Sequence, residues 1–326
     1  MKSVALPRRP AVRLSELGFG AAQGGNLYRV RTDEEFAGAV DAAWDAGIRY
    51  FDTAPHYGLG LSERRLGAAL RPRPRDEYVV STKVGRLLVP SPETASSADS
   101  EGFAVAADHR RVWDFSRDGI LRSLESSLER TGLDRIDVVY LHDPDDHWRQ
   151  AVAEAVPALV ELRDQGVIRA IGAGMNQSQM LTRFVRETDI DLVMCAGRFT
   201  LLEQGALDDL LPAADQHGVA VVVAGVYNSG MLAHDWPPAN ATYNYQQAPA
   251  ELLDRAIHIA RVCQSHGATL PEAALAYVRT HAAVVSTVVG MGSADQVNET
   301  VRRANANVPD DLWPALEAAR LIHLGR

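Results

Sequence analysis

The sequence predicts an α/β fold, a (β/α)8 TIM barrel with long loops at the carboxyl ends of its strands. Short apolar runs rich in β-branched residues alternate with longer segments of helical periodicity, as in chains that build parallel sheets. The run Val219-Ala-Val-Val-Val is typical of a strand covered on both faces. The chain has 326 residues, a length that accommodates eight strand–helix units. A doubly wound open sheet is the alternative architecture.

The predicted strands are recognised by their apolar character and by the turn residues that bound them. Each is followed by a segment long enough for a helix, the pattern of parallel strands joined by helical crossovers. The eight strands are expected at residues 17–21, 48–53, 78–83, 136–142, 168–173, 190–195, 219–224 and 284–289.

Helix boundaries are signalled by capping residues. Thr32-Asp-Glu-Glu35 predicts a capping box that opens a helix ending near Gly47. Ser62 and Ser116 are predicted N-caps of the next two helices. Four further glycines stand where helix C-terminal caps are expected, Gly132, Gly166, Gly218 and Gly267.

Two long loops interrupt the alternation, at residues 87–113 and 227–249. They follow the third and seventh predicted strands, so both emerge at the face where barrel enzymes place their sites. No composition break or internal repeat divides the chain, and residues 1–326 are expected to form a single domain.

Composition narrows the function classes. The chain carries 33 Lys and Arg against 42 Asp and Glu, a formal net charge of −9. This acidic balance argues against a nucleic-acid partner, whose affinity comes from clustered cations. Cys195 and Cys263 form no CxxC pair and predict neither a disulfide framework nor a zinc site. Apolar stretches are too short for a signal peptide or a membrane span, so we expect a cytoplasmic protein without a membrane partner.

Four polar residues of different chemistry stand at the ends of three consecutive predicted strands. Asp52 stands at the end of the second strand and Tyr57 in the loop after it, and Lys83 and His142 end the third and fourth strands. Taken singly, each has a structural explanation as a turn aspartate, a rim lysine or a core histidine. Because parallel barrel strands deliver their carboxyl ends to one rim, the set together favours an active site.

These side chains suit proton transfer to and from a carbonyl oxygen. A free tyrosine titrates at about 10, too high for easy proton exchange at neutral pH. We expect Lys83 to lower the pKa of Tyr57 and Asp52 to hold the lysine charged. We expect His142 to bind and orient the substrate oxygen.

The chain resembles the aldo-keto reductase superfamily over nearly its whole length. Residues 47–58, Gly-Ile-Arg-Tyr-Phe-Asp-Thr-Ala-Pro-His-Tyr-Gly, carry the resemblance together with Ser-Glu at 62–63 and Leu-Gly at 66–67. Asp52, Tyr57, Lys83 and His142 match the family's catalytic tetrad in order and spacing. The resemblance implies a nicotinamide cofactor extended across the barrel mouth. It also implies that Tyr57 is the general acid in reduction and the general base in oxidation.

A glycine-rich turn after the eighth strand, with a serine that caps the following helix, predicts a site for the cofactor phosphates. NADP-preferring members of the family often carry a cation in this turn. This chain has none before Arg302, so NAD is modestly favoured over NADP. The expected cofactor contacts are Gly20, Asn176, Gly225, Gly290, Gly292, Ser293, Gln296 and Glu299.

Several segments depart from the family pattern. Only Asn176 carries over from the Ser–Asn pair after the fifth strand, and no glutamine follows the sixth. The glycines from Gly18 to Gly24 have GxGxxxG spacing and are not followed by a helix, so they are not a Rossmann fingerprint. Phe19 and Trp113 are the candidate substrate-binding residues, with core packing an equal alternative for Phe19.

The segments 171–177 and 224–230 and the run His-Asp-Pro-Asp-Asp at 142–146 resemble one branch of the family. That branch comprises bacterial aldose 1-dehydrogenases, including L-fucose (D-threo-aldose) dehydrogenases, with pyridoxal 4-dehydrogenases nearby. It implies oxidation of the anomeric carbon of an aldose such as L-fucose to its lactone. Pyridoxal oxidation and broad NADPH-dependent aldehyde reduction are the alternatives within the class, and the partner in each case is a small molecule.

Two alternatives lie outside this class. The run from His142 to His147 holds two imidazoles and three carboxylates, which suggests a metal-dependent hydrolase. The Asp-Pro pair inside this run forces a turn that would point the side chains in different directions, so no metal site is expected. The second alternative is a cofactor-binding regulator without turnover. A homo-oligomer stays open, because a surface patch and a core stripe look alike in a sequence.

Overall fold

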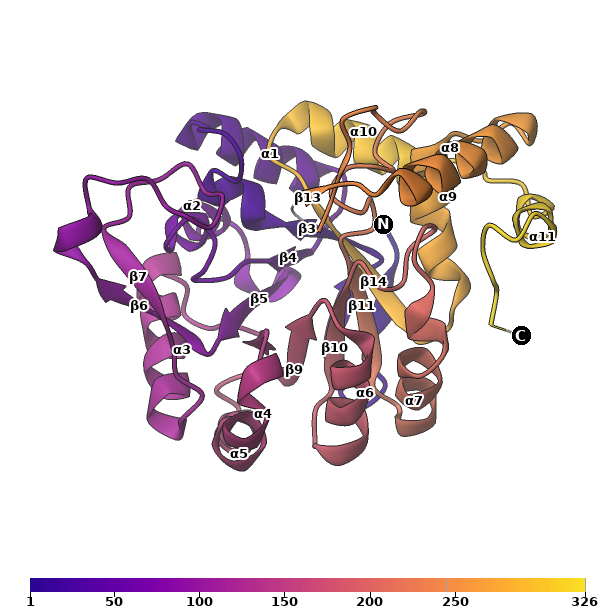
Figure 1. Cartoon of the computed structure of the whole chain (residues 1–326). Coiled ribbons are helices and arrows are strands. Elements are labelled where there is room, and N and C mark those ends of the chain that lie inside the picture. The colour runs from indigo at the N-terminus through magenta and orange to yellow at the C-terminus, as the bar shows by residue number, and fades with distance from the viewer. Residues whose placement is uncertain (245, 326) are drawn as a thin grey trace.

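Eight parallel strands close into a barrel that is covered outside by helices, as Figure 1 shows. The computed structural model describes residues 1–244 and 246–325. Tyr245, inside the long loop expected at 227–249, and Arg326 lie outside the described residues. The predicted TIM barrel is confirmed, and the open-sheet alternative is excluded by the closed strand order.

Each barrel strand pairs with the barrel strand that precedes it along the chain, and the last, β14, pairs with the first, β3. All eight overlap the predicted strands. They are β3 (Leu17–Gly20), β4 (Tyr50–Asp52), β5 (Val79–Val84), β8 (Val138–His142), β9 (Ala170–Met175), β10 (Leu192–Ala196), β11 (Ala220–Ala224) and β14 (Val284–Gly290).

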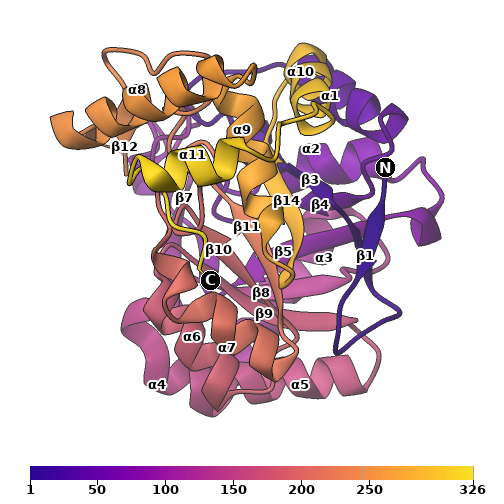
Figure 2. The same ribbon diagram turned by 90° about the vertical axis from the view of Figure 1, so that its right-hand side faces the viewer.

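The helices follow the strands around the outside of the barrel. In Figure 2, α11 lies next to α8, which also packs against α9. Within the described ranges, no helix is long and apolar enough to cross a membrane. The helices are α1 (Asp33–Asp45), α2 (Leu61–Leu70), α3 (Arg117–Thr131), α4 (Trp148–Gln150), α5 (Val156–Asp164), α6 (Ser178–Glu187), α7 (Leu210–His217), α8 (Ala250–Ser265), α9 (Leu270–Tyr277), α10 (Ala294–Ala304) and α11 (Leu312–Ala318).

The helix caps follow the sequence signals with two exceptions. Thr32 caps α1 by accepting from the Glu35 backbone N–H, but the Glu35 side chain pairs with Arg31 instead of completing the predicted box. Ser116 caps α3 as predicted. Ser62 is not an N-cap: it lies inside α2, where its buried hydroxyl donates to the Ala21 carbonyl. The four predicted C-terminal glycines all have positive φ, as such caps require.

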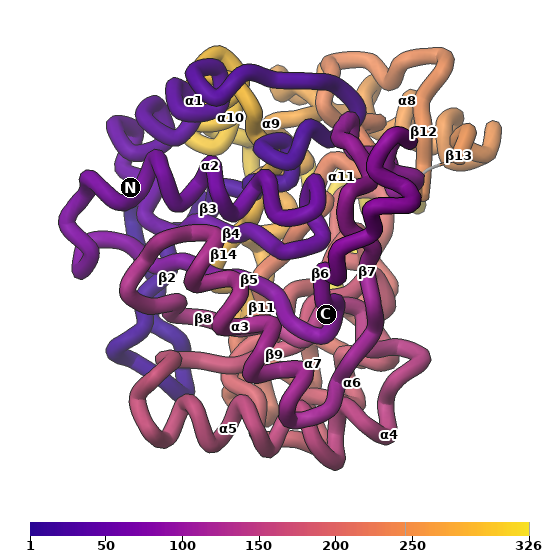
Figure 3. The backbone as a smooth tube through the Cα atoms, turned by 90° about the vertical axis from the view of Figure 1, so that its left-hand side faces the viewer, coloured from indigo at the N-terminus to yellow at the C-terminus, as the bar shows by residue number. Residues whose placement is uncertain are grey.

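Two hairpins outside the barrel were not expected from the sequence. β1 (Ser3–Ala5) and β2 (Arg13–Ser15) form the first, whose Leu6 and Leu14 pack with Tyr50 and Tyr140 in the barrel interior. The predicted loop 87–113 contains the second, β6 (Arg86–Pro90) and β7 (His109–Trp113), seen as two adjacent strands in Figure 3. A two-residue ladder, β12 (Thr242–Tyr243) with β13 (Gln246–Gln247), forms in the other long loop.

Candidate active site

The carboxyl ends of the barrel strands open into a cavity of about 700 Å³. Its wall is built from the loops after β3, β4, β5, β8 and β9 and from the segment that connects β6 to β7. Tyr57, Lys83 and His142 all line it, so the structure brings three of the four predicted catalytic side chains to one cavity.

The fourth residue, Asp52, lies directly beneath Lys83. The Lys83 Nζ donates to Asp52 Oδ2 at 2.7 Å and to the Thr53 carbonyl at 3.0 Å. Ser81 donates to the other carboxylate oxygen of Asp52 at 2.7 Å. Both charged side chains are almost completely buried, at 3% and 4% exposure. Burial lowers the pKa of Lys83, but Asp52 and Tyr57 outweigh it and raise the pKa, so the lysine stays charged.

Tyr57 is the proton-transfer candidate of the set. The Lys83 Nζ lies 4.8 Å from the centre of its ring. Burial raises the pKa of Tyr57, and the nearby Lys83 offsets only part of that effect, so the pKa is raised above its usual value. Lys83 does lower this pKa, as expected, but the net shift is upward, because the cost of burying a phenolate exceeds the attraction of one ammonium.

His142 is buried at the end of β8, with its ring 6.0 Å from that of Tyr57. Burial, together with Arg86 and Lys83, lowers its pKa well below the usual value, so the imidazole is neutral. Its Nδ1 has no hydrogen-bond partner among the described residues. Since buried polar atoms are normally paired, this orphan nitrogen indicates a ring left free to bind a ligand oxygen or to reorient toward one.

His56 and Phe103 complete the cavity beside Tyr57, and sequence reasoning missed both. The Phe103 ring lies 5.3 Å from that of His56 and 6.1 Å from that of Tyr57. A bridge between Leu27 and Phe103 fastens this segment to the loop after β3. The signal for Phe103 was weak, because it is an isolated aromatic in a loop whose pairing depends on contacts distant in sequence.

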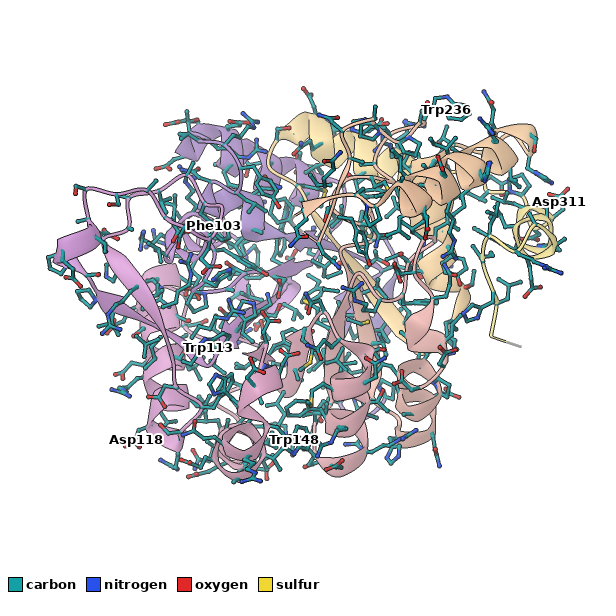
Figure 4. All side chains as sticks on the ribbon, in the orientation of Figure 1. Phe103, Trp113, Asp118, Trp148, Trp236 and Asp311 are labelled. Carbon is teal, nitrogen blue, oxygen red and sulfur yellow. The ribbon has the colours of Figure 1, made fainter. Side chains whose placement is uncertain are left out.

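The structure places the two predicted substrate-wall aromatics elsewhere. Phe19 is fully buried and packs against Phe36 and Phe51, because on β3 it alternates with Gly18 and points outward to the helices. Trp113 is not among the cavity-lining residues, and it stacks behind Arg86 with 4.2 Å between guanidinium carbon and ring centre. Figure 4 labels Phe103 and Trp113 on the same side of the barrel.

The glycine-rich turn after β14 has the form of a phosphate cradle. No atom lies within 4 Å of the point where a Cβ on Gly290 would stand, so the backbone there is open to a ligand. Ser293 caps α10 by accepting from the Gln296 N–H, and the Gln296 side chain accepts from the Gly292 N–H at 2.9 Å. Backbone donors at the N-terminus of an 11-residue helix suit an anionic cofactor group.

The other predicted cofactor contacts are spread around the same rim. Asn176 is exposed and lines the cavity, with its carbonyl accepting from Arg198 at 2.7 Å. Gly225 is exposed with φ of 64°, whereas Gly20 is buried against Val289. Glu299 pairs with Arg302 and Arg303 on the same helix.

A cation lies closer to this turn than the sequence indicated. A Cβ on Gly292 would stand 2.5 Å from the Arg31 Nε, so the two residues are in contact. Arg31 is nevertheless 5% exposed, and its guanidinium donates to Glu35 and Gln23. Glu35 also pairs with Arg29, so one carboxylate serves two guanidinium groups beside this turn.

The histidines of the run 142–147 do not converge. The His142 ring contacts His56 and Tyr57, whereas His147 packs against Trp113 and Phe115. In the ranges that the structure describes, no group of three or more His, Cys, Asp or Glu side chains is arranged to hold a metal ion.

A phenol, a buried ammonium–carboxylate pair and a neutral imidazole at a barrel mouth beside a phosphate cradle define the class of NAD(P)-dependent oxidoreductases. The aldo/keto reductase family model matches residues 16–320. The chain belongs to the aldo/keto reductase family.

Two relatives and one solved structure are similar over most of the chain. D-threo-aldose 1-dehydrogenase of Pseudomonas sp is 51% identical over 94% of this chain and 94% of its own length. Pyridoxal 4-dehydrogenase of Microbacterium luteolum is 35% identical over 96% of each chain. The holo form of an aldo-keto reductase from Bacillus halodurans superposes with a TM-score of 0.76 at 25% identity, covering 99% of this chain and 97% of that one.

Proposed function

We propose that this enzyme oxidises the anomeric carbon of an aldose such as L-fucose to the lactone, in the cytoplasm and with NAD preferred over NADP. The observation that carries the proposal is the cavity that joins Tyr57 and His142 above the buried Lys83–Asp52 pair. The 51% identity to an enzyme named D-threo-aldose 1-dehydrogenase supports the choice of substrate class.

Each of the four residues has a separate role in moving the proton of this reaction. His142 binds the anomeric oxygen as a neutral imidazole, which positions the hydroxyl beside Tyr57. As the C1–H bond breaks, the Tyr57 oxygen takes the hydroxyl proton and a C=O bond forms at C1. Tyr57 is held as a neutral phenol, so its own proton must leave to solvent before it can act as the base. Lys83 stabilises the resulting phenolate, which then takes the hydroxyl proton, and Asp52 keeps the lysine in place.

A nicotinamide cofactor, when bound, supplies the acceptor for the hydride that leaves C1. Gly290, Gly292 and Ser293 would hold its phosphates, with Glu299 and Gln296 beyond them on α10 and Asn176 at the other end. Gly20 and Gly225 are the remaining proposed contacts. The preference for NAD rests on the sequence of the turn, which has no Lys or Arg from Gly290 to Val301. Arg31, the nearby cation, is buried and donates to Glu35 and Gln23.

Pyridoxal oxidation is the second candidate. The 35% identity to an enzyme named pyridoxal 4-dehydrogenase favours it, and the aromatic wall made by Phe103 and His56 suits a flat ring. The same Tyr57 chemistry would apply to the cyclic hemiacetal that pyridoxal forms between its 4-aldehyde and its 5-hydroxymethyl group.

The deciding measurement is formation of reduced nicotinamide, followed by absorbance, with NAD or NADP and a panel of aldoses plus pyridoxal. We expect L-fucose or a related aldose with NAD to give the highest kcat/KM. Activity with pyridoxal alone would replace the substrate and keep the mechanism. No turnover with any pair, despite measurable cofactor binding, would overturn the proposal.

A further inference from the structure

One wall of the cavity is polar and belongs to none of the four catalytic residues. Arg86 at the start of β6 and Asp143 directly after β8 both line the cavity, and Glu101 joins them from the segment that connects β6 to β7. The Arg86 Nη2 donates to Asp143 Oδ2, and its Nη1 lies 3.3 Å from the His56 Nδ1. With Trp113 stacked on its other face, Arg86 is held on three sides and only 14% exposed.

The position of Asp143 is set by its backbone. Its φ is 42°, in the left-handed region that residues other than glycine rarely adopt. The backbone N–H donates to the Gly174 carbonyl at 3.0 Å and holds this conformation. Strained backbone of this kind persists where surrounding structure enforces it and is concentrated at ligand sites. The carboxylate is thus aimed at the cavity by fixed backbone and by Arg86.

Asp143 retains one oxygen for a ligand. Arg86 occupies Oδ2, whereas Oδ1 accepts no hydrogen bond from any residue in the described ranges. The carboxylate is 34% exposed and lines the cavity. A charged carboxylate oxygen with open lone pairs is an acceptor for hydroxyl groups.

The charges of the cavity wall disfavour anionic substrates. Asp52 neutralises Lys83, and Asp143 neutralises Arg86. Burial and the neighbouring cations lower the pKa of His56 to about 2, so that imidazole is uncharged. Glu101 is then the unbalanced charge among the described lining residues, and it disfavours an anionic substrate.

We propose that Asp143, held by Arg86, is the specificity-determining residue that selects uncharged, polyhydroxylated substrates over hydroxyl-free aldehydes and over phosphate esters. The Oδ1 atom accepts hydrogen bonds from substrate hydroxyls, and the negative balance of the wall rejects a phosphate. This inference rests on the proposed function, for which it names the residue that recognises the sugar.

The test compares three aldehydes in the reductive direction: glyceraldehyde, propanal and glyceraldehyde 3-phosphate. Wild-type enzyme is compared with Asp143→Asn and with the control Asp146→Asn, an equal charge change on an exposed residue outside the cavity. We expect Asp143→Asn to lower the kcat/KM ratio of glyceraldehyde to propanal about tenfold or more, mainly through KM. The relative kcat/KM for the phosphate ester rises, because Arg86 loses its counter-charge. Asp146→Asn leaves both ratios unchanged.

Two further variants make the outcome decisive. Glu101→Gln should raise the relative kcat/KM for the phosphate ester and leave the glyceraldehyde-to-propanal ratio near that of wild type. Asp143→Glu retains the charge for Arg86 and carries the test if Asp143→Asn does not fold: it should lose the hydroxyl preference and keep the rejection of phosphate. A wild-type glyceraldehyde-to-propanal ratio in the Asp143 variants, or equal losses for all three aldehydes, would overturn the proposal.

Failure of this proposal is distinguishable from failure of the proposed function. If wild-type enzyme oxidises no aldose but reduces glyceraldehyde with an Asp143-dependent preference, lactone formation is wrong and the specificity assignment stands. If aldoses are oxidised but substitution of Asp143 changes neither kcat/KM ratio, the function stands and the specificity assignment is wrong.

Discussion

At the scale of single residues, burial decides the protonation states of Tyr57 and His142 more than neighbouring charges do. Burial is the largest influence on the pKa of Tyr57, which it raises, and on that of His142, which it lowers. The enzyme therefore holds a phenol and a neutral imidazole at neutral pH. Both are hydrogen-bonding groups toward an oxygen, and the charges of Lys83 and Arg86 beside them are paired with Asp52 and Asp143.

Tyr57→Phe should abolish proton transfer with little effect on packing. The phenylalanine ring keeps its contact with Phe103 and loses only the hydroxyl. We expect kcat to fall by about 10²–10⁴-fold, while cofactor affinity, measured by quenching of tryptophan fluorescence, stays within about twofold, which corresponds to less than about 0.5 kcal/mol. Tyr78→Phe, outside the cavity, is the control and should keep its turnover. Turnover near the wild-type level in Tyr57→Phe would exclude the assigned role.

His56 predicts how stability depends on pH. Its folded pKa is lowered to about 2, against about 6.5 in an unfolded chain. Below about pH 6.5 the unfolded state binds a proton that the folded state does not, so stability falls as pH falls, by about 1.4 kcal/mol per pH unit. We expect His56→Gln, whose amide oxygen can still accept from Arg86, to remove about this slope between about pH 6 and 4.

Urea unfolding at a series of pH values measures the effect. The exposed His258→Gln on α8 is the control and should retain the wild-type slope. An unchanged pH slope in His56→Gln would show that the imidazole is not held neutral in the folded protein.

At the scale of elements, the loop that carries Tyr57 is fixed by a close backbone contact. Gly58 has φ of 61°, and a Cβ there would stand 2.2 Å from the Gly25 carbonyl oxygen. Arg111 of β7 reaches the same loop, donating to the His56 carbonyl at 2.9 Å while its guanidinium pairs with Asp99. The β6–β7 hairpin thus acts on the catalytic loop from outside the barrel.

Gly58→Ala should displace Tyr57 as well as weaken the fold. The left-handed conformation and the clash with Gly25 together are expected to cost about 2 kcal/mol or more. The loop must shift to relieve the clash, so kcat should fall too. Gly38→Ala is the matched control: its Cβ meets open space within α1, and it should raise stability by about 0.5–1 kcal/mol. Thermal unfolding and steady-state kinetics check both, and unaltered kcat in a folded Gly58→Ala enzyme would contradict the argument.

At the scale of the whole molecule, the barrel has two apolar layers. One lies between the strands and the surrounding helices, and the other fills the barrel interior. The β1–β2 hairpin contributes Leu6 and Leu14 to the interior layer, beside Tyr50 and Tyr140. A terminal hairpin is therefore part of the core on which the closed sheet depends.

Leu14→Ala should destabilise the entire barrel and not the hairpin alone. The side chain is fully buried, so its loss leaves a cavity and costs about 2–5 kcal/mol. We expect the urea midpoints from far-UV circular dichroism and from tryptophan fluorescence to fall together. Val30→Ala, at a residue 68% exposed, is the control and should change stability by less than about 0.5 kcal/mol. Separate midpoints, or no change, would show that the hairpin unfolds independently.

The four candidate catalytic residues could be proposed from the sequence because strand ends are local features. Each of the eight strands is marked by its own apolar run, and Asp52, Lys83 and His142 stand at the ends of such runs. Closure of the parallel sheet then delivers those ends to one rim, whatever the loops do. The caps Thr32 and Ser116 were readable for the same reason, since their hydrogen bonds span only three residues.

Only the tertiary structure decided what surrounds those residues. Three of these contacts join segments far apart in the chain, and no local sequence pattern predicts them. They are Arg31 with Gly292, Arg86 with Asp143, and Phe103 with Leu27. The sign of the Tyr57 pKa shift likewise depends on burial, which the packing of the whole barrel mouth sets. The sequence by itself determined the barrel and the strand-end positions of the candidate catalytic groups, because short-range periodicity encodes them. The tertiary structure decided their electrostatics and the polar wall beside them, because those arise from long-range packing.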